Sequence, residues 1–124
     1  MVTLDTNFLI YYLKGDASAV AVFESLIRAY TPVFVATVTE TELFSLPTLT
    51  LGEGERIEAV LSLFSVLPLD SQIARKAAEL RRLTPKIKLA DSVIAATALF
   101  TNSTLLTRNV KDFKKITGLA VQAV

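Results

Sequence analysis

The sequence predicts an α/β fold in which helices cover both faces of a mainly parallel central sheet, giving a three-layer α/β/α sandwich. One observation behind this prediction is that short apolar runs alternate with helical segments along the whole chain. Another is that these runs are continuously apolar, as in strands buried on both faces. The length of 124 residues suits one compact core, so a single domain over 1–124 is expected.

In the first half of the chain, capping and turn residues separate the elements. Asp5 and Asp16 are of a type that accepts hydrogen bonds from the first turn of a helix. Overlapping capping boxes begin at Thr37 and at Thr39, which leaves that helix start in two registers. The expected elements are a strand at 2–4, helices at 8–13 and 16–30, a strand at 33–35, a helix from Thr37 or Thr39 to Pro47, a loop at Gly52 and Gly54, and a helix at 57–64.

The second half continues the alternation. Asp70 caps another helix and Pro85 closes that segment. The segment from Lys88 to Phe100 carries apolar residues on two sides of a helix, which predicts that this helix is buried. The expected elements are a strand at 66–67, helices at 70–85 and 88–100, a strand at 104–106, a short helix at 109–115 and an edge strand at 119–121.

The composition excludes several kinds of chemistry. The chain has no Cys and no His, which rules out thiol nucleophiles, thiolate or imidazole zinc sites and histidine bases. Carboxylates remain, and their oxygens favour hard cations, Mg²⁺ first and Mn²⁺ as a plausible substitute. No apolar run approaches the roughly 18 residues of a membrane span. A signal peptide requires a basic segment before its apolar stretch, and this sequence has none before its apolar start. A cytoplasmic protein without a membrane partner is therefore expected.

Charge is distributed unevenly along the chain. Residues 1–62 hold eight acids and three bases, a net charge of −5, whereas residues 63–124 hold four acids and ten bases, a net charge of +6. Clustered bases of this kind can contact phosphates, although a solvated helix face explains them equally well when they are taken alone. The charge pattern is therefore compatible with a nucleic-acid partner.

Acidic residues follow the ends of several predicted strands, where ligands bind in open α/β sheets. Asp5 follows the first strand, Glu42 lies just after the second, Asp91 lies in the first turn of the buried helix, and Asp112 follows the fourth. Each also has a structural explanation as a cap, a capping-box partner, a first-turn acid or a solvated residue. Asp91 fits its explanation least, because it shares a helix face with apolar residues. Glu40 competes with Glu42, and the two point to opposite sides of their helix.

Four segments of the chain resemble PIN domains, and among them the VapC-type toxins of prokaryotic toxin–antitoxin pairs. The four segments occur in the order and spacing of the family and together span nearly the whole chain. They are VTLDTNFLI at 2–10, TETEL at 39–43, LADSVIAATA at 89–98 and LLTRNVKDF at 105–113.

The resemblance implies a metal-dependent endoribonuclease that leaves 5′-phosphate and 3′-hydroxyl ends through attack of a metal-activated water. Asp5, Glu42 and Asp91 match the first three acids of the family. Where the family often has a fourth Asp this sequence has Asn109, and Asp112 offers a carboxylate directly or through water. The metal ligands implied are therefore Asp5, Glu42, Asp91, Asn109 and Asp112.

The resemblance also implies supporting residues and partners. Thr6 and Thr107 match small hydroxyl residues that support the ligating carboxylates. Lys88, Arg108 and Lys111 are candidates for holding the RNA backbone. The family further implies a homodimer and a VapB-like antitoxin, with Tyr11, Tyr12 and Val22 as candidate apolar contacts, each of which is equally compatible with the core.

Two other interpretations keep the predicted fold. A degenerate PIN domain would bind RNA or a protein without cutting, and Asn109 is its main support. A phosphoacceptor domain of the response-regulator kind also gathers acids, a Thr and Mg²⁺ at strand ends, but the sequence has no paired acids after the first strand and no Lys directly after a late strand.

Overall fold

In the computed structural model, which describes residues 1–124, five parallel strands form one sheet in the order β3-β2-β1-β4-β5. The central strand β1 pairs with β2 through Val2 opposite Val33, and with β4 through Leu4 opposite Leu106. The carboxyl ends of the strands therefore share one edge. The strands are β1 (Val2–Leu4), β2 (Val33–Ala36), β3 (Ser65–Leu67), β4 (Thr104–Thr107) and β5 (Val121–Ala123).

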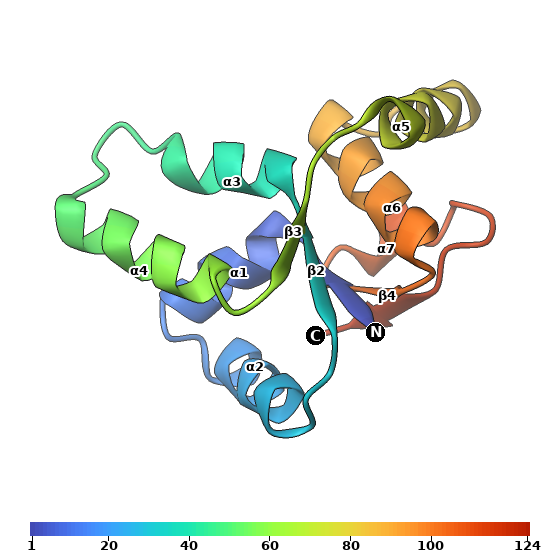
Figure 1. Ribbon diagram of the computed structural model, residues 1–124. Coiled ribbons are helices and arrows are strands. Elements are labelled where there is room, and N and C mark those ends of the chain that lie inside the picture. Colours follow the sequence, from blue (N-terminus) through green and yellow to red (C-terminus); the bar gives the residue numbers. More distant parts are fainter.

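Helices cover both faces of the sheet, with α1 to α4 on one side and α5 to α7 on the other (Figure 1). One buried apolar cluster, which includes Phe8 and Phe23, lies on the α1–α4 side, and a second, which includes Ile94 and Phe113, lies on the other. The predicted α/β/α sandwich is confirmed. The helices are α1 (Thr6–Leu13), α2 (Ala17–Arg28), α3 (Thr37–Phe44), α4 (Leu51–Leu61), α5 (Ser71–Leu83), α6 (Leu89–Thr101) and α7 (Val110–Phe113). None of them is both long and apolar enough to cross a membrane.

The predicted aspartate caps form as the sequence indicates. Asp5, Asp16 and Asp70 each accept a hydrogen bond from the backbone N–H three residues later, at the starts of α1, α2 and α5. Each such cap stabilises a protein by about 1 kcal/mol. The cap at Asp5 also fixes this carboxylate at the sheet edge, because β1 ends only one residue earlier.

Helix α6 is the most deeply buried helix, and it determines where Asp91 lies. Every residue from Ser92 to Ala98 is buried, and the helix contacts β1, β2 and β4 of the sheet. The prediction of a buried helix is confirmed. Because α6 begins at Leu89, Asp91 lies in its first turn, at the edge of the sheet to which Asp5 also belongs.

Four local predictions were wrong in detail. Gly52 and Gly54 lie inside α4, whose start is stabilised by a reciprocal pair in which the Thr50 hydroxyl accepts from the Glu53 N–H and donates to the Glu53 carboxylate. Helix α3 begins at Thr37 without a side-chain cap, so neither predicted capping box forms. The last strand lies at 121–123 instead of 119–121, and the short helix ends at Phe113.

Candidate active site

The predicted acids meet in one cleft at the carboxyl edge of the sheet. The cleft has a volume of about 320 Å³ and draws residues from α1, α3, α6, α7 and the loops next to α5 and α7. Asp5 is buried and does not line the cleft, but its charge acts on Asp91, which does. The cleft is lined by Asn7, Glu42, Thr84, Lys86, Ile87, Lys88, Ala90, Asp91, Asn109, Asp112, Phe113 and Lys115.

Asp5 is a buried carboxylate held in place by two donors. Its side chain is 4% exposed, and it accepts from the Phe8 N–H at 2.8 Å and from the Thr107 hydroxyl at 2.6 Å. Burial raises the pKa of Asp5, the two hydrogen bonds oppose that rise, and the charge of Glu42 adds to it. The carboxyl group is thus fixed in orientation in a place where its charge is costly without a counter-ion.

Asp91 carries the strongest evidence that the acids face one another. Burial raises the pKa of this half-buried carboxyl group, and the charges of Asp5, Glu42 and Asp112 raise it further. The charge of Lys88 acts in the opposite direction. Four acids from separate segments therefore share one electrostatic environment, which favours binding of a cation.

Glu42 is oriented by a hydroxyl group from a neighbouring helix. The Thr6 hydroxyl on α1 donates to Glu42 Oε1 at 2.6 Å, and the Thr39 hydroxyl lies 3.0 Å from the Thr6 hydroxyl. Glu40, the alternative considered from the sequence, does not line the cleft. Thr6 thus contacts the carboxylate of Glu42, and Thr107 contacts that of Asp5. From the sequence, Thr39 was considered only as a helix cap.

The fourth acidic position is shared between two residues. The Asn109 side-chain amide donates to Asp112 Oδ2 at 2.9 Å, and the Asn109 N–H donates to the Thr107 hydroxyl. Both side chains line the cleft. The Asp112 carboxylate is therefore tied to the position where the family resemblance implies a carboxylate.

The basic residues of the cleft differ from those expected. Lys88 lines the cleft together with Lys86 and Lys115, which sequence analysis did not single out as site residues. Lys111 does not line it. The only signal for Lys86 and Lys115 was the excess of basic residues in 63–124, because the sequence does not show which side chains a loop brings to the cleft.

Arg108 does not line the cleft. Its guanidinium pairs with Asp16, donates to the Val124 carbonyl and lies 4.1 Å from the centre of the Tyr11 ring. The hydrogen bond between Arg108 and Asp16 lowers the pKa of Asp16 and raises that of Arg108. Arg108 therefore ties the chain end to α1 and α2.

The donor set of the cleft fits a hard cation. No three of the acids lie close enough to share an ion directly. Mg²⁺, however, usually keeps several water ligands and needs only one or two protein carboxylates. Asp5 and Asp91 offer such oxygens, and neither of them forms an ion pair within the chain.

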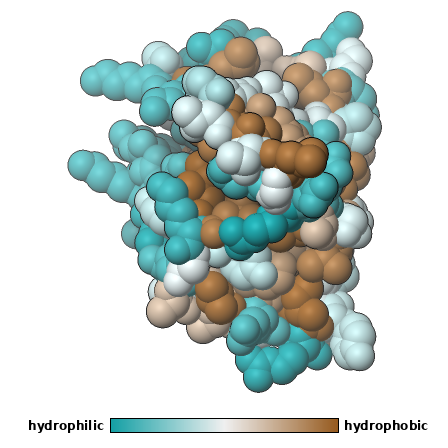
Figure 2. Space-filling model, turned by 90° about the vertical axis from the view of Figure 1, so that its left-hand side faces the viewer, coloured by the Kyte–Doolittle hydropathy of each residue, from teal (hydrophilic) through white to brown (hydrophobic).

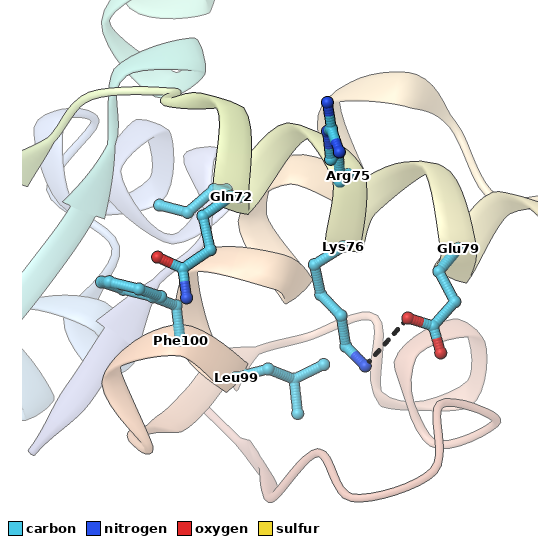
Figure 3. Close-up of a pocket in the computed structure, with 7 residues that line it drawn as sticks. Gln72, Arg75, Lys76, Glu79, Leu99 and Phe100 are labelled. Carbon is cyan, nitrogen blue, oxygen red and sulfur yellow. Dashed lines mark hydrogen bonds and ion pairs between the residues drawn. The ribbon is translucent and has the colours of Figure 1, made fainter.

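A second cavity, of about 350 Å³, lies between α5 and α6 and is lined mainly by residues of α5 (Figure 3). Its one acidic residue, Glu79, pairs with Lys76 at 3.3 Å. Leu99 and Phe100 supply its apolar wall, while Arg75 points away from that ion pair. A cavity without a free carboxylate does not offer the chemistry of the cleft, although it is slightly larger.

The fold and the acidic cleft are those expected of a PIN domain, and comparison with known proteins gives the same family. The model of the PIN domain matches residues 2–119, so the chain belongs to the PIN-domain family. The chain is 33% identical to ribonuclease VapC1 of Rickettsia felis, over 98% of this chain and 94% of that protein.

Solved structures show the same fold. FitAcB from Neisseria gonorrhoeae has a TM-score of 0.82 and 31% identity, over 98% of this chain and 96% of that one. A toxin–antitoxin complex from Klebsiella pneumoniae has a TM-score of 0.79 and 30% identity, over 97% and 96%. VapBC2 from Rickettsia felis bound to a promoter DNA fragment has a TM-score of 0.84 and 24% identity, over 100% and 99%, which concerns the fold alone.

Proposed function

We propose that this protein is a cytoplasmic Mg²⁺-dependent endoribonuclease, the toxin of a type II toxin–antitoxin pair. The observation that carries the proposal is that Glu42, Asp91 and Asp112 line one cleft, while the buried Asp5 acts on Asp91 through its charge. The relationship to a protein named ribonuclease VapC1 supports RNA as the substrate. The absence of His and Cys agrees with a reaction that runs on carboxylates.

In the proposed mechanism each residue has a distinct role. Asp5 and Asp91 would hold the metal, and Asn109 and Asp112 would complete the site directly or through water. Bound there, Mg²⁺ would acidify and orient a water and neutralise charge on the phosphate. Glu42 accepts the proton of the attacking water or ligates the metal. In-line attack breaks the bond between phosphorus and the 3′ oxygen, which leaves 5′-phosphate and 3′-hydroxyl ends.

End-labelled RNA tests this proposal directly. Purified protein should cut single-stranded or structured RNA with Mg²⁺ or Mn²⁺ and should not cut it in EDTA, and the fragments should carry 5′-phosphates. RNA binding that persists in EDTA, with no cutting under any condition, would overturn the proposal. That result would favour a degenerate PIN domain that binds RNA, which the Asn at position 109 makes the second candidate.

Lys86, Lys88 and Lys115 are assigned to the RNA backbone because they line the cleft beside the acids. Changing Lys86 to Ala should weaken RNA binding in EDTA and reduce the slope of log K against log salt by about 0.7, the value for one lost phosphate contact on a single strand. Fluorescence anisotropy at several salt concentrations measures both quantities. Arg108→Ala is the matched control, and it should leave the slope unchanged because Arg108 pairs with Asp16. An altered slope in Arg108→Ala alone would contradict the assignment.

We also propose a VapB-like antitoxin as partner, because the structural relatives include members of toxin–antitoxin systems. On the face formed by α1 to α4, hydrophobic side chains gather in a hollow between hydrophilic ones (Figure 2). An apolar cleft of about 140 Å³ on α1, α3 and α4, lined in part by Ile10, Leu43 and Leu46, offers a surface for it. Co-expression with the antitoxin should yield a stable complex that does not cut RNA. We further propose that the free protein is a homodimer, and light scattering measures its mass.

The residues suggested earlier as antitoxin contacts are half-buried. Tyr12 stacks on Phe23 with ring centres 3.8 Å apart, Tyr11 lies under the Arg108 guanidinium, and Val22 is half-buried. Leu46, in contrast, is 54% exposed. The apolar cleft is therefore the better candidate surface.

A further inference from the structure

Thr39 is a buried threonine whose hydroxyl group does not bond within its own helix. It is fully buried in α3, and its hydroxyl lies 3.0 Å from that of Thr6 on α1. A threonine inside a helix commonly donates to the carbonyl one turn earlier, as Thr97 does to Val93 at 2.8 Å. Thr39 instead reaches a neighbouring helix.

The direction of the hydrogen bonds follows from proton counting. An ionised carboxylate only accepts, so the single hydroxyl proton of Thr6 goes to Glu42 Oε1, at 2.6 Å. Thr6 is then left with lone pairs only toward Thr39, and the Thr39 hydroxyl must donate to Thr6. The result is a one-way chain from Thr39 through Thr6 to Glu42, in which each hydrogen bond polarises and strengthens the next.

Glu42 depends on this chain for its orientation. The residue is exposed, and its carboxylate has no side-chain hydrogen bond other than the one from Thr6. Fixing a glutamate side chain costs rotamer entropy of about the same size as the contribution of one hydrogen bond to a charged group, so the orientation of Glu42 is sensitive to how firmly its one donor is held. A Thr6 hydroxyl that is itself held by Thr39 is a better fixed donor than one free to rotate.

We propose that Thr39 is a positioning residue of the active site, which acts through Thr6 to hold the Glu42 carboxylate toward the metal and the attacking water. This inference rests on the proposed function, since it concerns the same site. It adds a third hydroxyl residue to Thr6 and Thr107, one that touches none of the acids.

The test compares Thr39→Val, which keeps the branched shape and removes the hydroxyl, with Thr39→Ser, which keeps the hydroxyl. Thr39→Val leaves no buried donor unpaired, because Thr6 still donates to Glu42, so the fold should survive. Mn²⁺ affinity by electron paramagnetic resonance should fall about tenfold, as is common when partners of ligating groups are lost. The kcat for RNA should fall by a similar factor with KM unchanged, and Thr39→Ser should restore both values.

Thr97→Val is the matched control, because it removes a buried threonine hydroxyl that bonds only within α6. It should leave Mn²⁺ affinity and kcat at wild-type values. The proposal is overturned if Thr39→Val behaves as the wild type, if Thr97→Val causes the same loss, or if Thr39→Ser fails to rescue. Should Thr39→Val not fold, Thr39→Ala measured against Thr39→Ser gives the same comparison.

The proposed function and this inference fail in different ways. Cleavage that requires Asp91 and is insensitive to Thr39→Val overturns the role of Thr39 alone. Absence of cleavage by the wild type overturns the ribonuclease, while the Mn²⁺ affinities of the variants still decide whether Thr39 positions Glu42. A wild type that binds no Mn²⁺ overturns both.

Discussion

Replacing Asp91 by Asn is expected to reduce Mg²⁺-dependent RNA cleavage by about 1,000-fold, equivalent to about 4 kcal/mol of transition-state stabilisation. Asn keeps the size of the side chain and one oxygen but removes the negative charge that attracts the cation. Asp91 is the acid on which the charges of Asp5, Glu42 and Asp112 all act, so it lies where the cation would be most strongly held. Single-turnover cleavage of a labelled RNA measures the loss.

Asp70→Asn is the control for this experiment. It makes the same chemical change at a helix cap outside the cleft, where the side chain accepts from the Ile73 N–H, and Asn caps helices as well as Asp. The control should cut RNA at the wild-type rate. Retention of full activity by Asp91→Asn would show that the acids of the cleft do not hold the catalytic metal.

Most of the fold could be predicted because its signals are local. The caps at Asp5, Asp16 and Asp70 are contacts between residues three positions apart. The start of α4 was missed because Gly52 and Gly54 each weaken a helix by about 1 kcal/mol. In α4 this weakening is outweighed by the capping pair of Thr50 with Glu53 and by the burial of the helix side chains. The last strand was misplaced because its limits depend on pairing with β4, through Leu105 opposite Val121, which no local pattern encodes.

The cleft could be predicted only in part. The meeting of Asp5 and Glu42 follows from their positions just after parallel strands, which share one edge. Asp91 lies instead in the first turn of α6. Arg108 also follows a strand, but its direction is set by Asp16, 92 positions away in the chain. Contacts between distant residues of this kind leave no periodic signal. The hydroxyl chain from Thr39 is a contact of the same type.

Mg²⁺ is expected to raise the melting temperature, and by more at pH 8 than at pH 5. Burial and mutual repulsion raise the pKa values of Asp5 and Asp91 above the ordinary 3.8. The folded protein therefore holds these protons more tightly than the unfolded chain. As a result, the contribution of these groups to stability falls as pH rises from 3.8 through the raised pKa values. Saturation at 100 times Kd adds about 2.7 kcal/mol, roughly 10 °C for a chain of this size.

Thermal denaturation followed by circular dichroism, with Mg²⁺ or EDTA at both pH values, measures this effect. Asp91→Asn is the informative variant, because it removes one of the repelling charges. It should melt at a higher temperature than the wild type in EDTA at pH 8 and should gain less from Mg²⁺. The comparison with this variant is needed because Asp16 changes stability with pH in the opposite direction. Its pKa is lowered, so the stabilisation that it contributes is lost as pH falls. A melting temperature that Mg²⁺ leaves unchanged at both pH values would mean that the four acids face one another without a cation site between them.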